Sequence, residues 1–108
     1  MGKQLESWLK GALRRASMRW PPIYTTRKNA RVARGKYRCA GYGRGEHIVP
    51  LTLQGKANTF VDHIIPVGKF IDWNTYIKNL FCDSSNLQIL CRECHDRKTK
   101  DESRSVNR

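Results

Sequence analysis

The sequence predicts a small α+β domain that holds a metal ion. Apolar residues recur at helical spacing near the amino terminus, and β-branched residues gather in the middle of the chain. A Cys-x-x-Cys pair, Cys91 and Cys94, then opens a polar stretch that suits a helix. A chain of 108 residues suits one domain but buries only a modest share of its surface. A bound metal would therefore help to stabilise the fold.

Residues 1–35 are predicted to form a basic helical extension. An amphipathic helix is expected over 3–17, where apolar residues lie at helical spacing: Leu5, Trp8, Leu9, Ala12, Leu13 and Ala16. The Trp-Pro-Pro sequence at 20–22 ends this helix, because consecutive prolines cannot continue it. A second helix is expected over 26–34, with Thr25 or Thr26 as its cap and Gly35 at its end.

Residues 36–103 are predicted to form the main domain, followed by a frayed tail over 104–108. Alternating or β-branched composition predicts strands at 48–53, 59–67 and 87–91. Turns are expected at 54–58 and 83–86. Helices are expected at 73–81, with Asp72 as the N-cap, and at 92–105.

The charge of the chain is concentrated in its first third. Residues 1–38 hold eleven of the 21 basic residues and one of the nine acidic ones, so they carry +10 of the net +12. Such segregation points to a polyanionic partner, with nucleic acid first and an anionic membrane surface a distant second. The alternative is that the charge serves solubility alone, but solubility does not require segregation by segment.

No part of the sequence is typical of a membrane span or a secretory leader. No run of 18 apolar residues occurs, and charged residues interrupt the amino-terminal helix. We therefore expect the protein in the cytoplasm, where thiols stay reduced. Paired cysteines in that setting are metal ligands more often than disulfides.

The pair Cys91 and Cys94 has the spacing of half a tetrahedral zinc site. Upstream, Cys39-Ala-Gly-Tyr42 has the glycine-rich turn of a second zinc knuckle, but a tyrosine stands where the second thiol is expected. Cys39, Cys91 and Cys94 are thus three expected ligands. The fourth position stays open, and the candidates are His47, Cys82, a water molecule or no ligand. Cys82, beside a phenylalanine, is more typical of a small buried apolar residue.

Asp62 and His63 are a second candidate site. An aspartate offers Mg²⁺ a hard oxygen ligand, and a histidine can accept a proton from water near neutral pH. Neighbours on a regular strand point to opposite faces, so the strand must be irregular here if both residues bind one ion. Pro66 favours such a break. Taken alone, His63 is more typical of an ordinary core or surface histidine.

The stretches VDHIIP and NLQILCRECHDRKT together resemble the HNH nuclease family, also called the His-Me finger or ββα-metal superfamily. The resemblance covers about residues 36–100. It matches Asp62-His63 on a first strand, Asn86 before a second strand, and His95 on the following helix. It implies a ββα-metal core, here with basic amino-terminal helices and a zinc knuckle in which Tyr42 departs from the pattern.

The resemblance also implies roles for these residues. His63 would be the general base, and Asp62 and His95 would hold one catalytic divalent ion, Mg²⁺, Mn²⁺, Ni²⁺ or Zn²⁺. Asn86 would brace the segment that orients His63. Zinc at the cysteines would be structural. Six basic residues are expected to face nucleic-acid phosphates, although those on the last helix also suit a solvated helix face: Arg31, Arg34, Lys36, Arg97, Lys98 and Lys100.

The implied activity is metal-dependent hydrolysis of phosphodiester bonds in DNA, double-stranded in the first instance, by a one-metal mechanism. A non-enzymatic, zinc-dependent DNA-binding module on the same scaffold is the alternative. A third hypothesis is a protein that works through a partner, either a second copy or packaging machinery, docked on the apolar face of residues 5–16. A bacterial host cell is the expected setting, with a phage gene as one source.

Overall fold

The computed structural model describes residues 2–106, with side chains as far as residue 103. Its helices are α1 (Lys3–Ser17), α2 (Pro21–Ala30), α3 (Trp73–Leu80) and α4 (Arg92–Val106), with a 3₁₀ turn at Ser84–Asn86. Its strands are β1 (Arg31–Ala33), β2 (Lys36–Cys39), β3 (His47–Pro50), β4 (Thr52–Leu53), β5 (Lys56–Ala57), β6 (Thr59–His63) and β7 (Leu87–Cys91). The predicted α+β class is confirmed.

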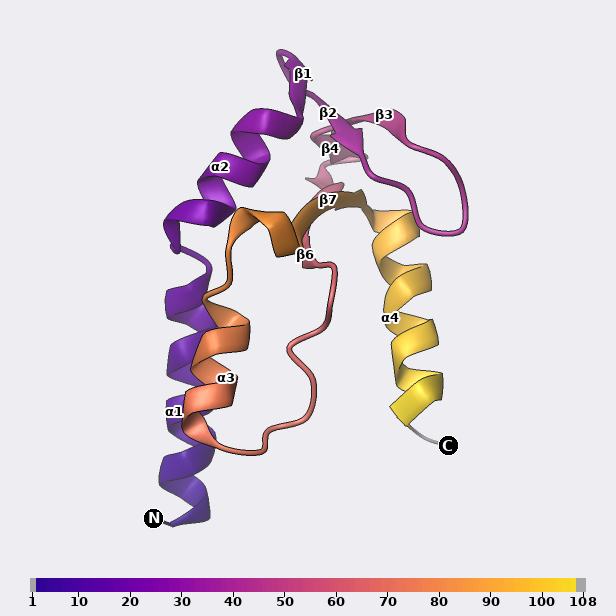
Figure 1. The fold of residues 1–108 in the computed structure, drawn as a ribbon. Coiled ribbons are helices and arrows are strands. Elements are labelled where there is room, and N and C mark those ends of the chain that lie inside the picture. Colours follow the sequence, from indigo (N-terminus) through magenta and orange to yellow (C-terminus); the bar gives the residue numbers. More distant parts are fainter. Residues whose placement is uncertain (1, 107–108) are drawn as a thin grey trace.

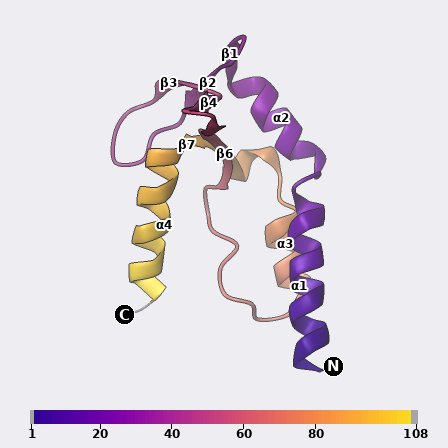
Figure 2. The same ribbon diagram turned by 180° about the vertical axis from the view of Figure 1, so that it is seen from behind.

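The strands form three small antiparallel sheets, with orders β1-β2-β3, β4-β5 and β6-β7. In the last sheet Thr59 pairs with Cys91 and His63 with Leu87. α1 and α3 lie side by side, whereas α4 descends from the far end of β7 (Figure 1). The connection from β6 to α3 runs between the α1–α3 pair and α4, as the reverse view also shows (Figure 2).

The helix predicted at 3–17 is confirmed as α1, and the helix predicted at 73–81 is confirmed as α3 with one residue fewer. The Asp72 cap is also present, because its Oδ1 accepts a hydrogen bond from the Thr75 backbone N–H at 2.8 Å. α4 begins where expected and continues to Val106, into the stretch predicted to fray. Residues 107 and 108 of that stretch lie outside the described residues.

The prediction of a helix over 26–34 is wrong. The helix begins at Pro21, and the chain from Arg31 onward is extended and forms β1. Proline ends a helix that precedes it, but it also suits the first turn of the next helix, where no backbone N–H is needed. Gly35, with φ +71°, serves the turn between β1 and β2 instead of ending a helix.

The cysteines lie together in one cluster of the small core, whose buried apolar residues also include Tyr76, Leu80, Leu87 and Ile89. Cys39, Cys91 and Cys94 are buried together with Val49 and Leu90, and Tyr42 packs against this cluster. Among the described residues no helix combines the length and apolar character that a membrane crossing requires. A metal ion bound by the cysteine side chains would add to the stability of so small a domain.

Candidate metal centre and adjoining cleft

Four side chains meet at the end of β7 to form a candidate metal centre: Cys39, His47, Cys91 and Cys94. Their ligand atoms all lie within 4.8 Å of one another. Two sulfurs on a tetrahedral zinc would be about 3.8 Å apart, from Zn–S bonds of about 2.3 Å. A small inward movement would therefore close the group on a metal ion. Three thiols and one imidazole are donors that suit zinc.

His47 is the candidate that the structure places in the fourth position. Its Nε2 lies 3.7 Å from the Cys91 Sγ. Cys82 is not part of the group, and its backbone carbonyl instead accepts a hydrogen bond from Trp20 Nε1 at 2.8 Å. The cluster thus joins the end of β2, the start of β3 and the junction of β7 with α4.

The turn after Cys39 has the shape that the first knuckle requires. Gly41 has φ +86°, and a Cβ atom there would lie 2.7 Å from the Gly45 carbonyl oxygen, so only glycine fits. The turn aims the Gly41 N–H at the Cys39 sulfur, at 3.4 Å, and the Cys91 N–H reaches the same sulfur at 3.2 Å. Both donors stabilise negative charge on that sulfur.

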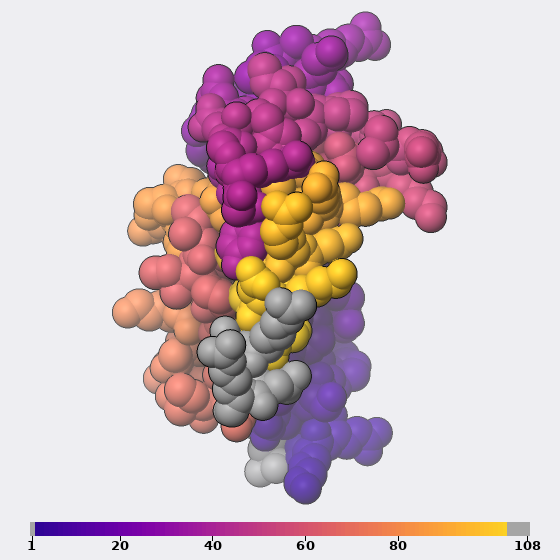
Figure 3. All heavy atoms as spheres, turned by 90° about the vertical axis from the view of Figure 1, so that its right-hand side faces the viewer, coloured from indigo at the N-terminus to yellow at the C-terminus, as the bar shows by residue number. Residues whose placement is uncertain are grey.

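Tyr42 has a structural contact in place of metal ligation. Its hydroxyl donates a hydrogen bond of 2.8 Å to Asp101 Oδ2 on α4, and this bond raises the pKa of the tyrosine. Arg97 donates to the Tyr42 carbonyl at 3.1 Å. The loop between β2 and β3 therefore lies along α4, as the side view shows (Figure 3). With His47 in the cluster, the site does not need a thiol at position 42.

Arg44 is a residue of this centre that sequence reasoning missed. Its guanidinium lies 2.9 Å from His47 Nε2, 3.6 Å from Cys91 Sγ and 3.3 Å from Glu93 Oε2. Burial acts to raise the pKa of Cys91, but hydrogen bonds from Cys94 and Arg44 outweigh it, and the pKa is lowered. Burial raises the pKa of Cys39 to about 11. In the sequence, the only sign that Arg44 belongs to this centre is its position between two candidate ligands, Cys39 and His47.

A cleft of about 970 Å³ adjoins this centre and brings together three of the predicted catalytic side chains. Asp62 and His63 at the end of β6 line the cleft together with His95 in the first turn of α4. His63 is the last residue of its strand, so it is not bound by strict alternation and reaches the same space as Asp62. Arg14 and Arg15 of α1 line the cleft as well.

The His63 ring is held through one nitrogen. Its Nε2 lies 3.3 Å from the Leu80 carbonyl oxygen at the end of α3. A carbonyl only accepts hydrogen bonds, so the proton of the neutral ring sits on Nε2 and Nδ1 keeps its lone pair. The ring can therefore accept a proton through Nδ1.

Asn86 clamps the segment that follows His63. Its Oδ1 accepts from the Ile65 N–H at 2.8 Å, and its Nδ2 donates to the Ile65 carbonyl at 3.2 Å. Its backbone carbonyl accepts from the Ile64 N–H at 2.8 Å. The expected bracing contact is thus present, and its catalytic value stays a prediction.

The prediction that Lys98 faces phosphate is wrong. Lys98 is 6% exposed, and its ammonium donates to Asp62 Oδ2 at 2.5 Å and to the His63 and Ile64 carbonyls at 2.6 and 3.1 Å. The position looks exposed on a polar helix, but α4 turns this face toward β6. Gln88 donates to the same Asp62 oxygen at 3.0 Å. Lys98 therefore fastens α4 to the end of β6.

The other predicted phosphate contacts lie outside the cleft. Arg31, Arg34 and Lys36 are exposed around the β1–β2 turn, and none of them lines the cleft. Lys100 is exposed on α4 and does not line it either. Arg97 also donates to Glu93 Oε1 at 3.2 Å, so both of its terminal nitrogens have protein partners.

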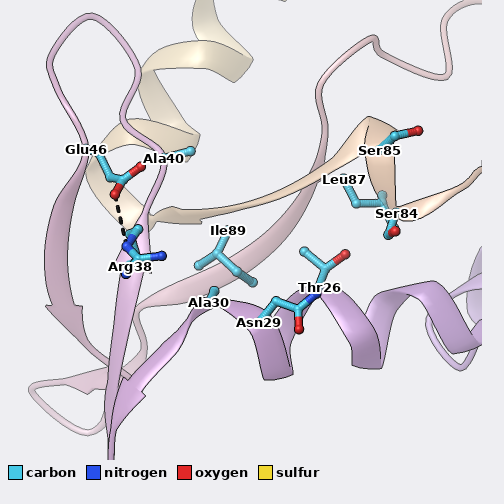
Figure 4. A pocket seen from close by; sticks show the side chains of 10 residues that line it. All are labelled: Thr26, Asn29, Ala30, Arg38, Ala40, Glu46, Ser84, Ser85, Leu87 and Ile89. Carbon is cyan, nitrogen blue, oxygen red and sulfur yellow. Dashed lines mark ion pairs between the residues drawn. The ribbon is translucent and has the colours of Figure 1, made fainter.

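A smaller pocket of about 350 Å³ lies between α2, β2 and β7, and none of the predicted catalytic residues lines it (Figure 4). Arg38 and Glu46 form an ion pair of 2.9 Å at its edge. The other lining residues are small or neutral. The pocket offers no cluster of nucleophilic or metal-binding side chains.

The two candidate sites share one helix start. Cys94 belongs to the metal centre, and the next residue, His95, lines the cleft and stacks on Phe60 with ring centres 4.9 Å apart. No family model, curated protein or solved structure matches the chain.

Proposed function

We propose that the protein is a divalent-metal-dependent DNA endonuclease with a ββα-metal core of the HNH type, formed by β6, β7 and α4. The observation that carries the proposal is the presence of Asp62, His63 and His95 in one cleft. Asp62 and His63 come from β6 and His95 comes from α4. These are the side chains that the resemblance assigns to the reacting centre. The proposed chemistry is hydrolysis of a phosphodiester to a 5′-phosphate and a 3′-hydroxyl.

His63 would act as the general base. A water oxygen attacks phosphorus, its proton passes to Nδ1 of His63, and the bond from phosphorus to the 3′-oxygen breaks. The leaving oxygen takes a proton from solvent. The Leu80 carbonyl and the Asn86 clamp would keep the ring and its segment in place for this transfer.

Asp62 and His95 would hold the catalytic ion. A divalent ion there would supply Lewis-acid polarisation of the phosphate and stabilise charge on the leaving oxygen. Asp62 Oδ2 accepts from Lys98 and Gln88, while Oδ1 has no hydrogen-bond partner within residues 2–103. Two protein ligands suit Mg²⁺, which completes its shell with water and substrate phosphate.

We further propose that zinc is the metal of the Cys39, His47, Cys91 and Cys94 cluster, with a structural role. Three thiol sulfurs and one imidazole nitrogen make a closed tetrahedral set with no position left for substrate. Such a zinc would fix the start of α4 and, with it, the backbone of His95.

A non-enzymatic DNA-binding module is the second candidate, and one observation favours it. The buried Lys98 ammonium already pairs with the Asp62 carboxylate, so this carboxylate has a cationic partner without a divalent ion. In that case the basic surface would bind DNA and no bond would be cut.

Plasmid cleavage decides between the two. The purified protein is incubated with supercoiled DNA in Mg²⁺, Mn²⁺, Ni²⁺ or no added metal, beside His63→Ala. Cys82→Ser is the control, since Cys82 belongs to neither site. The endonuclease predicts metal-dependent nicking or linearisation that His63→Ala abolishes and Cys82→Ser retains. A protein that shifts DNA on a gel but never cuts it contradicts the enzyme and supports the binding module.

A further inference from the structure

The cleft has a second wall, and the part of it that α1 supplies lies outside the stretch that the resemblance covers. Its residues come from the last turn of α1 and the connection between β6 and α3, and they include Arg14, Arg15 and Lys69. These three cations face the space that also contains Asp62, His63 and His95. The charge segregated in the first third of the sequence therefore reaches the candidate reaction centre through α1.

The cations of this wall are available to a ligand. All three residues are exposed, and within residues 2–103 none of their side-chain nitrogens makes a hydrogen bond or an ion pair. Other cations differ in this respect, because Arg97, Lys98 and Arg44 are bound to protein acceptors. Guanidinium groups suit phosphate because they offer paired donors in one plane.

The opposite wall carries one carboxylate and, among its lining residues, no lysine or arginine. It is formed by α4, where Glu102 lines the cleft beside Thr99 and Ser103. Asp62 contributes little net charge, since Lys98 pairs with it. A polyanion in the cleft would therefore lie along the α1 wall and approach α4 only near His95, where the proposed divalent ion would be held.

We propose that Arg14, Arg15 and Lys69 bind the phosphates that flank the scissile bond, so that α1 is part of the substrate-binding site. This inference rests on the proposed function for the location of the scissile bond. The partner is a nucleic-acid backbone, and the predicted contacts at Arg34 and Lys36 are secondary to those on α1. Lys69 extends this wall, because it lies on the connection that follows β6.

The test compares two double variants that remove the same charge. Arg14→Gln with Arg15→Gln removes two cations from the cleft, and Arg34→Gln with Lys36→Gln removes two from the β1–β2 turn. Binding of a fluorescein-labelled 12-nucleotide single strand, and of the matching duplex, is followed by anisotropy between 50 and 200 mM salt without added divalent ion. KM and kcat for cleavage are measured in parallel.

We expect the cleft pair to weaken binding and raise KM about tenfold at 100 mM salt, with kcat within about twofold. The slope of log Kd against log salt should fall by about 1.4 for the single strand. The pair at the β1–β2 turn should change Kd less than about threefold. Arg14→Lys with Arg15→Lys should keep most of the binding, which separates loss of charge from damage to α1.

Equal effects of the two double-glutamine variants, or a larger effect at the β1–β2 turn, would overturn the inference. The outcomes for the two proposals remain distinct. If the unmodified protein cleaves DNA and the Arg14→Gln, Arg15→Gln variant cleaves it equally well, the α1 contact is rejected and the nuclease is kept. Absence of cleavage, with binding that the cleft pair selectively weakens, rejects the nuclease and keeps the α1 contact.

Discussion

The ammonium group of Lys98 lies 2.5 Å from Oδ2 of Asp62, and the two side chains are 8% and 10% exposed. The pair joins the middle of α4 to the end of β6, and the same ammonium also binds two backbone carbonyls of the segment that begins at His63. One lysine therefore sets the position of the strand end that carries both Asp62 and His63.

Removal of the Lys98 charge should strongly destabilise the fold. Lys98→Met leaves the Asp62 carboxylate buried without its cation, and loss of one partner of a buried pair costs about 3–5 kcal/mol. Lys100→Met, two residues along the same helix and exposed, should stay within about 0.5 kcal/mol. Urea unfolding followed by tryptophan fluorescence measures both. Asp62→Asn combined with Lys98→Met should recover part of the loss, and equal stability of the two single variants would contradict the structural role of Lys98.

The metal content of the protein should depend on four side chains and not on the remaining cysteine. We expect one zinc per chain by elemental analysis. Cys94→Ser and His47→Ala should each contain less than half of that, because each variant lacks one of the four ligands. Cys82→Ser should retain the full content. A zinc content that survives His47→Ala unchanged would remove His47 from the ligand set.

Restoring the expected thiol at position 42 should not improve the metal centre. Tyr42→Cys should leave the zinc content at one per chain, because His47 would already supply the fourth ligand. It also removes the hydrogen bond to Asp101, so the urea midpoint should fall, as it should in Tyr42→Phe. Tighter zinc binding by Tyr42→Cys, measured by competition with a chromogenic chelator, would show that His47 is the weaker partner.

Asn86→Ala should lower the turnover number more than it raises KM. The amide makes two hydrogen bonds to Ile65 and none to a group that lines the cleft, so its loss frees the segment after His63 without touching substrate. We expect kcat to fall about tenfold or more, since small misplacements of reacting groups are costly. Ser85→Ala, on the neighbouring exposed residue, is the control. An unchanged kcat with a lower unfolding midpoint would make Asn86 purely structural.

Local patterns were sufficient for α1, α3 and the start of α4, whereas β1 was predicted to be helical. The apolar periodicity of residues 3–17 and the Asp72 cap each depend on a few neighbours along the chain, and both are confirmed. The start of α2 was missed because Pro21 and Pro22 are compatible with either the end of one helix or the beginning of the next. Sequence spacing alone does not distinguish these two roles.

The site depended on tertiary contacts that spacing cannot supply. His47 lies eight positions after Cys39 and outside any Cys-x-x-Cys pair, so only the pairing of β2 with β3 brings it to the cluster. Lys98 has the sequence context of an exposed helical lysine, and the turn of α4 toward β6 buries it. The Asp62-His63 pair was found because its chemistry is local, although its roles stay predictions.

The metal cluster also has a topological consequence. Cys39 and Cys91 lie 52 positions apart, so an ion bound to both ties the intervening chain into a closed ring that contains β6 and α3. In the chain-entropy account, a covalent bridge over that span would disfavour the unfolded ensemble by about 4 kcal/mol. α1 and α2 precede the ring. A protease that cuts before residue 31 would therefore separate α1 and α2 from the ring without opening it. In limited proteolysis, fragments that lack α1 and α2 should appear before any cleavage within the ring.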